Sequence, residues 1–159
     1  EDGAVAEASV ASVSGRVTLK RSFGKKLSFL TVKDDVGTIQ IYLDSGIVGN
    51  DNYERMLRWI DVGDIVGFCG HMKRTKKGEL SVVVNDWSML TKSLQQLPDK
   101  HFGLQDINKR YRQRYIDMIT NDTVRNTIRI RSEVIQQMRS ALNEEGFLEM
   151  ETPILSCKF

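Results

Sequence analysis

The stretch that decides the fold reads Leu27-Ser-Phe-Leu-Thr-Val-Lys33, Asp34-Asp-Val-Gly37 and Thr38-Ile-Gln-Ile-Tyr-Leu43. This pattern predicts two strands joined by a tight turn, because successive side chains in a strand point to opposite faces. One face is aliphatic and predicts a core, made of Leu30, Val32, Ile39, Ile41 and Leu43. The opposite face carries a ring, a hydroxyl, an amide and a phenol, from Phe29, Thr31, Gln40 and Tyr42.

The mixed chemistry of that second face has two interpretations. Hydrophobic burial does not call for such a set, whereas a nucleobase offers a flat surface for stacking and edges for hydrogen bonds. The alternative is an ordinary solvated face with one exposed phenylalanine, since single exposed apolar residues are common. The two strands alone leave both interpretations open.

Composition excludes several classes of protein. The 159 residues suffice for one domain and the start of another, and the net charge of +2 does not by itself indicate nucleic acid. Two distant cysteines and two lone histidines predict neither a disulfide framework nor a metal site. No apolar run approaches the ~20 residues that a membrane span requires. The lack of a disulfide pattern favours a reducing compartment, so we expect a cytoplasmic protein. Plastid and mitochondrion are alternatives, because the first residue is Glu and we expect the native N-terminus to be missing.

The order of elements predicts the fold class. After a disordered lead-in over 1–9, strands are expected over 10–21, 27–33, 38–43, 65–72 and 79–90. A short helix between the third and fourth strands follows from the apolar spacing of Tyr53, Met56, Leu57 and Ile60. This is the order of an OB-fold, a five-stranded Greek-key barrel, here over 10–93. In the fifth strand we expect Leu80, Val82 and Val84 on the core face, and Trp87 on the opposite face with Glu79, Ser81, Val83 and Asn85.

Two basic loops flank the polar face. An OB-fold binds ligands through strands two and three and through the loops joining strands one–two and four–five. Those loops carry Lys20, Arg21, Lys25 and Lys26 in the first, and Lys73, Arg74, Lys76 and Lys77 in the second. Although one charged loop is usually a solvated tip, two of them beside an exposed ring predict a groove for single-stranded nucleic acid.

The rest of the chain is expected to start a second domain. A linker over 94–108 precedes a helix over 109–119, whose arginines are either solvated or in contact with a nucleic-acid backbone. Asn121 or Asp122 caps a longer helix over 123–145, which Gly146 ends. A strand over 147–153 is expected next. Because the sequence stops just after this strand pattern, we expect its C-terminal boundary, like its N-terminal one, to lie within a longer protein.

Three parts of the chain are distinctive as sequence: Val13-Ser-Gly-Arg16 through Gln40-Ile-Tyr42, Lys73-Arg-Thr-Lys-Lys-Gly-Glu-Leu-Ser81, and Leu97-Pro-Asp-Lys-His-Phe-Gly-Leu104 with Arg110-Tyr-Arg-Gln-Arg-Tyr115. Together they resemble the N-terminal part of class II lysyl-tRNA synthetases. Gly146-Phe-Leu-Glu-Met-Glu-Thr-Pro153 and the helix before it resemble motif 1 of class II synthetases. The aspartate and asparagine enzymes are relatives, but 97–115 resembles the lysyl enzymes.

The resemblance implies an anticodon-binding site for the uridine-rich lysine tRNA. Phe29 falls where the family stacks a ring on a base, Gln40 where it reads a base edge, and Arg21 and Glu79 at its other base contacts. A glutamine carbonyl or a glutamate carboxylate can accept a hydrogen bond from uracil N3–H but not from cytosine. The alternative for Glu79 is a carboxylate that balances neighbouring lysines. The full set expected to bind RNA is Arg21, Phe29, Gln40, Glu79, Lys20, Lys25, Lys26, Lys73, Lys76 and Lys77.

The resemblance also implies what the full-length protein does. It would be a homodimeric lysine–tRNA ligase using ATP and Mg²⁺, while this chain, without motifs 2 and 3, is expected to be inactive alone and to need no cofactor. Its partner would be tRNA, with neither DNA nor membrane expected. Residues 109–159 would start the catalytic domain, and their motif 1 helix and strand would build the dimer surface, exposed in this chain, with Val124, Ile128, Ile135 and Pro153. The alternatives are a free-standing OB-fold binder of single-stranded nucleic acid and a truncated paralogue acting through the dimer surface.

Overall fold

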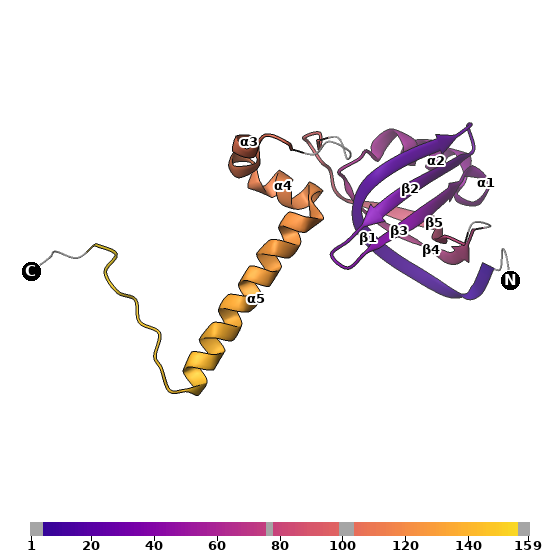
Figure 1. Ribbon diagram of the computed structural model, residues 1–159. Coiled ribbons are helices and arrows are strands. Elements are labelled where there is room, and N and C mark those ends of the chain that lie inside the picture. Colours follow the sequence, from indigo (N-terminus) through magenta and orange to yellow (C-terminus); the bar gives the residue numbers. More distant parts are fainter. Residues whose placement is uncertain (1–4, 76–77, 99–103, 156–159) are drawn as a thin grey trace, which may run out of the picture. The chain divides into compact units, whose positions relative to one another are not determined.

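Five strands close into a barrel in the computed structural model, which describes residues 5–75, 78–98 and 104–155. They are β1 (Val5–Phe23), β2 (Leu27–Lys33), β3 (Thr38–Asp44), β4 (Ile65–Arg74) and β5 (Leu80–Thr91). Their order around the barrel is β1-β2-β3-β5-β4, with β3 and β5 parallel and the other pairs antiparallel (Figure 1). This confirms the OB-fold class.

The β2–β3 hairpin forms as the sequence predicts. The carboxylate of Asp34 accepts hydrogen bonds from the backbone N–H groups of Val36 (2.8 Å) and Gly37 (2.7 Å), which fixes the turn. The resulting register pairs Phe29 with Tyr42 and Thr31 with Gln40. The predicted core face is confirmed, because its members are buried or pack against the buried core, namely Leu30, Val32, Ile39, Ile41 and Leu43.

Strand β1 is longer than expected and changes partner along its length. It begins at Val5, which pairs with Lys73 of β4, so residues 5–9 belong to a strand rather than to a disordered lead-in. The extension forms because β4 offers a free edge for backbone hydrogen bonds. Partner exchange occurs at Arg16, which pairs with Ile65 of β4 and Lys33 of β2. Beside it, a Cβ on Gly15 would come within 2.7 Å of the Lys33 carbonyl oxygen, so the close approach requires glycine.

Strand β5 changes face in its middle, and this corrects one sequence prediction. The pairing shifts from Gly70–Val84 to Cys69–Asp86, which leaves Asn85 as the extra residue of a β-bulge. Residues beyond the bulge are therefore displaced by one position in the alternation. Trp87 packs against the core with Val82 and Val84, whereas the strict alternation predicted it on the opposite face.

Two short helices cover the barrel between β3 and β4. They are α1 (Ser45–Val48), which the sequence pattern did not predict, and α2 (Asn50–Trp59), whose predicted apolar stripe is confirmed. Tyr53, Met56 and Ile60 are buried in the core. The Tyr53 hydroxyl lies 2.7 Å from the Ser28 hydroxyl oxygen, which satisfies the one polar side chain on the core face of β2.

A buried carboxylate ties the ends of β4 and β5 together. Asp64, fully buried, accepts hydrogen bonds from Lys92 Nζ (2.8 Å) and from the backbone N–H groups of Asp61 (2.7 Å) and Ser93 (2.7 Å). Burial alone would raise the pKa of Asp64, but these hydrogen bonds outweigh it and hold the pKa below its usual value. The ionised carboxylate thus has several donors at the point where the chain leaves the barrel.

The second compact unit begins at Pro98 and is helical in its described part. It contains α3 (Ile107–Arg112), α4 (Arg114–Thr120) and α5 (Asp122–Glu144). The single helix predicted over 109–119 is wrong, since Gln113 leaves the helical region with φ −117° and ψ 52°. The break accompanies a shared ion pair, in which Arg110 Nε (3.2 Å) and Arg114 Nη1 (2.8 Å) both donate to the buried Asp117.

Helix α5 has the predicted ends, but the strand expected after it does not form. The Asn121 side chain accepts hydrogen bonds from the backbone N–H groups of Thr123 and Val124, and Gly146 ends the helix with φ 85°. The described residues 147–155 form no strand, because no neighbouring strand in the described chain supplies a partner.

The four residues predicted for a dimer surface differ in exposure. Val124 is only 8% exposed, because it packs where α4 meets α5, so its prediction as an exposed dimer residue is wrong. Ile128 is half-buried, while Ile135 and Pro153 are exposed.

Candidate nucleic-acid interface

Three aromatic rings follow one another across the outer face of β1, β2 and β3. The Phe29 ring centroid lies 5.5 Å from that of Phe23 and 5.4 Å from that of Tyr42. Both contacts are edge-to-face, with interplanar angles of 89° and 81°. Phe29 is half-buried and outside the core cluster, as expected for a ring on the outer face. We call Phe23, Phe29 and Tyr42 the ring row.

A hydrogen-bonded amide lies next to the ring row. Gln40 Nε2 donates to Glu79 Oε2 (2.9 Å), and the Ser81 hydroxyl donates to Gln40 Oε1 (2.7 Å). Strand pairing sets these contacts, because β3 and β5 run in parallel with Gln40 opposite Ser81. The amide is held at both ends yet keeps one N–H and one carbonyl lone pair for a further partner. Such an amide can pair with a uracil edge, which offers one donor and adjacent acceptors.

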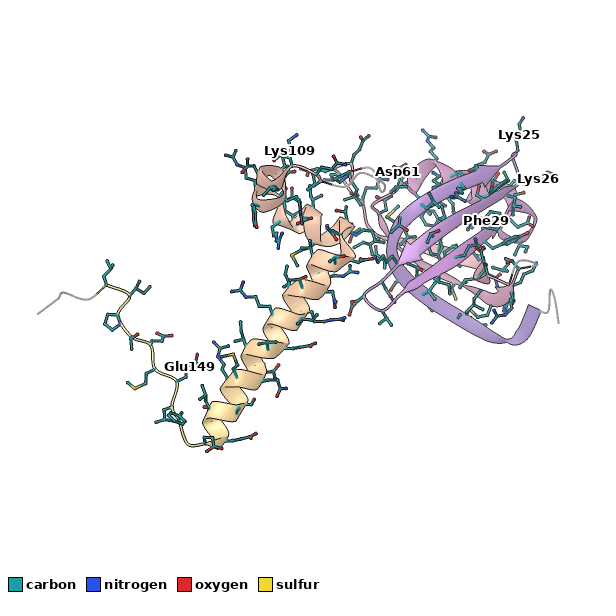
Figure 2. All side chains as sticks on the ribbon, in the orientation of Figure 1. Lys25, Lys26, Phe29, Asp61, Lys109 and Glu149 are labelled. Atoms are coloured by element: carbon teal, nitrogen blue, oxygen red, sulfur yellow. The ribbon has the colours of Figure 1, made fainter. Side chains whose placement is uncertain are left out.

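Cations border the rings at two places. Lys73 Nζ lies 5.1 Å from the centroid of the Tyr42 ring, a cation–π geometry that holds this ammonium over the outer face. Lys25 and Lys26 are exposed at the tip of the β1–β2 hairpin, with Phe29 further along β2 (Figure 2). Arg21 is exposed and pairs with Phe29 across the hairpin. Lys76 and Lys77 lie outside the described residues.

Lys20 is the one described lysine of the predicted set that has a structural role. Its Nζ donates to the backbone carbonyls of Leu57 (2.6 Å) and Ile60 (2.7 Å) at the C-terminal end of α2. Burial lowers the pKa of Lys20, opposed by the nearby Asp61. The predicted RNA contact is therefore not supported, since this ammonium satisfies helix carbonyls that would otherwise lack partners.

The Tyr42 phenol faces a carboxylate. Its hydroxyl donates to Asp44 Oδ2 at 3.4 Å, and Asp44 also accepts from the backbone N–H of Gly46 at the start of α1. Burial raises the pKa of Tyr42, and the Asp44 charge raises it further. The phenol therefore stays neutral at physiological pH and presents an uncharged ring to the outer face.

Sequence reasoning left Phe23 and Ser81 out of the site. Phe23 is two residues from Arg21 in a strand, so the two side chains share a face, and that spacing was the available signal. Ser81 could be recognised only from the parallel pairing of β3 and β5, which joins segments about forty positions apart. No cluster of three or more His, Cys, Asp or Glu suited to a metal occurs among the residues that the structure describes.

A closed five-stranded barrel with aromatic rings, a hydrogen-bonded amide and cations on one outer face is typical of OB-fold proteins that bind nucleic acid. Residues 11–90 match the model of the OB-fold nucleic acid binding domain, so the chain belongs to that family. Residues 106–158 match the model of class II tRNA synthetases (D, K and N).

Several relatives that the chain matches carry the name lysine–tRNA ligase. The chain is 52% identical over 144 residues to "Lysine--tRNA ligase, chloroplastic/mitochondrial" of Arabidopsis thaliana. This match spans 91% of the chain and 24% of that protein. It is 53% identical over 148 residues to the lysine–tRNA ligase of Thermosynechococcus vestitus, and the match spans 91% of the chain and 29% of that protein. It is 47% identical over 162 residues to the lysine–tRNA ligase of Prochlorococcus marinus, and the match spans 98% of the chain and 31% of that protein. The resemblance to lysyl-tRNA synthetases is thus confirmed, and the chain spans less than a third of these relatives' lengths.

Proposed function

We propose that this chain is the anticodon-binding part of a lysine–tRNA ligase, which attaches lysine to its tRNA in an ATP-dependent reaction. The observation that carries the proposal is the Gln40 amide, held between Glu79 and Ser81 beside the Phe29 ring. The names of the relatives supply the amino acid and the tRNA.

In this proposal, different side chains supply the affinity for RNA and the selection of one base over another. Stacking on Phe29 contributes about 1–3 kcal/mol per base and distinguishes little between bases. Gln40 and Glu79 select uracil, because its N3–H donates to an oxygen acceptor, whereas cytosine presents only a lone pair there. An unmatched polar contact of this kind costs roughly 1–3 kcal/mol. Lys25, Lys26 and Lys73 supply attraction for phosphates without base preference.

Three further features belong to the whole ligase. ATP and Mg²⁺ would act in its catalytic reaction, and we derive no step through them from the residues described. Dimerisation would use the exposed apolar side chains of α5 and the segment that contains Pro153. A cytoplasmic location is proposed, with plastid or mitochondrion as alternatives, since one relative carries the name chloroplastic/mitochondrial. No helix in the described ranges has the length and apolarity of a membrane span.

The test is binding to an RNA hairpin with three uridines in its loop, compared with the same hairpin carrying a central cytidine. We expect roughly 5- to 100-fold tighter binding of the uridine loop, from the cost of one unmatched polar contact. Gln40→Ala should reduce that ratio, while Phe29→Ala should weaken both complexes alike. Binding of both should fall steeply between two salt concentrations. The measurement is fluorescence anisotropy, with thermal unfolding to verify that each variant folds.

The alternatives predict different results. Equal binding of uridine, cytidine and DNA loops contradicts anticodon reading and indicates a general single-strand binder. Absence of RNA binding, with binding to another synthetase chain through 123–159, indicates a truncated paralogue. A large loss of stability in Phe29→Ala contradicts the placement of that ring on the outer face.

A further inference from the structure

We propose that Phe23 is a second stacking platform, which takes the base adjacent in the loop to the base on Phe29. The inference rests on the proposed function for the identity of the RNA. It assigns a base-contacting role to a residue outside the set that the sequence resemblance supplied. The ligand chemistry is a pair of neighbouring unpaired bases in a single-stranded loop.

The first argument is exposure combined with contact. The Phe23 side chain is 58% exposed, although it lies within an aromatic contact of Phe29. A ring that served only to fix Phe29 would gain by being covered, since burial of aromatic surface is favourable. Phe23 instead leaves most of its surface in water at the end of the ring row. That surface is available to a base, and every base has a face that can stack.

The second argument is orientation. Phe23 and Phe29 are nearly perpendicular, at 89°, so bases stacked on the two rings cannot also be stacked on each other. The loop must therefore splay its bases apart. Unpaired loops permit this, and proteins that recognise single-stranded RNA commonly bind bases in that state. A stacked duplex does not, so the ring row favours a hairpin loop over a helix.

The third argument is the surroundings of Phe23. It is the last residue of β1, and Gly24 turns the chain with φ 65° directly into the exposed Lys25 and Lys26. A ring followed by two ammonium groups provides stacking for a base and attraction for its phosphates.

The platform is also held in place. Next to Phe23, the Ser22 hydroxyl is hydrogen-bonded by Ser28 Oγ (3.0 Å), which in turn lies 2.7 Å from the buried Tyr53 hydroxyl. The turn itself is joined to α1 by the hydrogen bond from Ser45 N to Lys26 O (2.9 Å). A ring carried on a fixed stretch of backbone requires less ordering of the chain when a base binds, which favours a defined contact.

The experiment uses the uridine hairpin with the fluorescent base 2-aminopurine at each loop position in turn. We expect the full chain to change the fluorescence at two adjacent positions. Phe29→Ala should remove the change at one position and Phe23→Ala the change at the other. Phe23→Ala should also weaken binding of the unmodified loop by roughly 5- to 100-fold. On a loop with an abasic site at the Phe23 position its effect should fall below about twofold, because the partner base is absent.

Two variants serve as controls. Phe23→Trp keeps a stacking surface and should retain both the fluorescence change and the affinity. Trp59→Ala removes an equally exposed ring, 59% exposed, which lines a hollow with Met89 and Lys92 near the opposite end of β5 from Ser81. It should leave binding unchanged. A Phe23→Ala variant that behaves like Trp59→Ala, or that weakens intact and abasic loops equally, overturns the platform.

Failure of the platform and failure of anticodon reading give different results. Two Phe-dependent fluorescence changes without preference for uridine over cytidine support the platform and contradict anticodon reading. Preference for uridine with no effect of Phe23→Ala overturns the platform alone. A chain that binds none of the hairpins overturns both.

Discussion

Two lysines of the same basic segment have unlike surroundings. Lys20 donates to two carbonyls at the end of α2, whereas Lys25 is exposed at the hairpin tip. The sequence could not separate them, because a run of Lys and Arg looks the same whether its members face solvent or a helix end. What decides the difference is the position of Leu57 and Ile60, 37 and 40 residues further along the chain. Phe29 and Gln40, by contrast, could be predicted, because local alternation alone set their face.

Substituting each lysine by methionine should separate stability from RNA binding. Lys20→Met leaves the Leu57 and Ile60 carbonyls without their donor, so we expect a loss of about 1–3 kcal/mol in the free energy of unfolding. Lys25→Met should leave stability within about 0.5 kcal/mol, as for most surface substitutions. It should instead weaken binding of the uridine hairpin and reduce its salt dependence by about one charge. Urea unfolding and salt-dependent anisotropy measure the two effects.

The opposite pattern would restore Lys20 to the RNA-binding set. If Lys20→Met were as stable as the parent chain yet bound RNA more weakly, its ammonium would be serving the ligand rather than the end of α2.

At the scale of elements, hairpins were predictable and the bulge was not. The β2–β3 hairpin depends on neighbours in sequence, namely Asp34 in the turn and alternation on either side. The bulge in β5 depends on β4, where Gly70 lets the backbone of Val83 approach closely. The helix break at Gln113 was missed because Tyr111 and Tyr115, four residues apart, keep a helical spacing across it.

The bulge makes Gly70 harder to replace than Gly67, the other glycine of β4. A Cβ there would lie 1.8 Å from the Val83 carbonyl oxygen, which is backbone and cannot turn aside. We expect Gly70→Ala to destabilise the barrel by about 3 kcal/mol or more, the upper end for overpacked sites. For a barrel of this size that corresponds to a fall of roughly 12–24 °C in melting temperature. Circular dichroism during heating measures it.

Gly67→Ala is the matched control in the same strand. Its Cβ would meet side chains, with Ser88 Oγ nearest at 3.1 Å, and that hydroxyl can rotate away. It should cost less than about 1 kcal/mol, near the centre of the range for single substitutions. Equal losses for the two variants would mean that the bulge does not bring the strands as close as described.

At the scale of the molecule, the two units differ in how they bury apolar surface. The barrel has a continuous core of side chains from all five strands and α2. In the second unit only Ile116, Asp117 and Val124 are buried among the described residues. Much of α5 remains exposed, including Val134, Ile135, Met138 and Leu142. Exposed apolar patches of this extent mark interaction surfaces, which supports the proposed dimer.

The apolar stripe of α5 makes the dimer testable by position around the helix. Ile135 lies on the stripe with Ile128 and Leu142, whereas Gln137 lies on the opposite face, about 160° around the helix from Ile135. Both residues, Ile135 and Gln137, are exposed. Ile135→Glu would place an unpaired charge in the interface, so we expect it to weaken dimerisation by at least about 30-fold, or roughly 2 kcal/mol. Gln137→Glu adds the same charge on the opposite face of α5 and should leave the dimer intact. Sedimentation velocity over a range of concentrations distinguishes the two. Equal weakening by both variants would show that net charge, rather than the stripe, controls association. Hairpin binding by the barrel should be the same for both variants, since neither position belongs to the barrel.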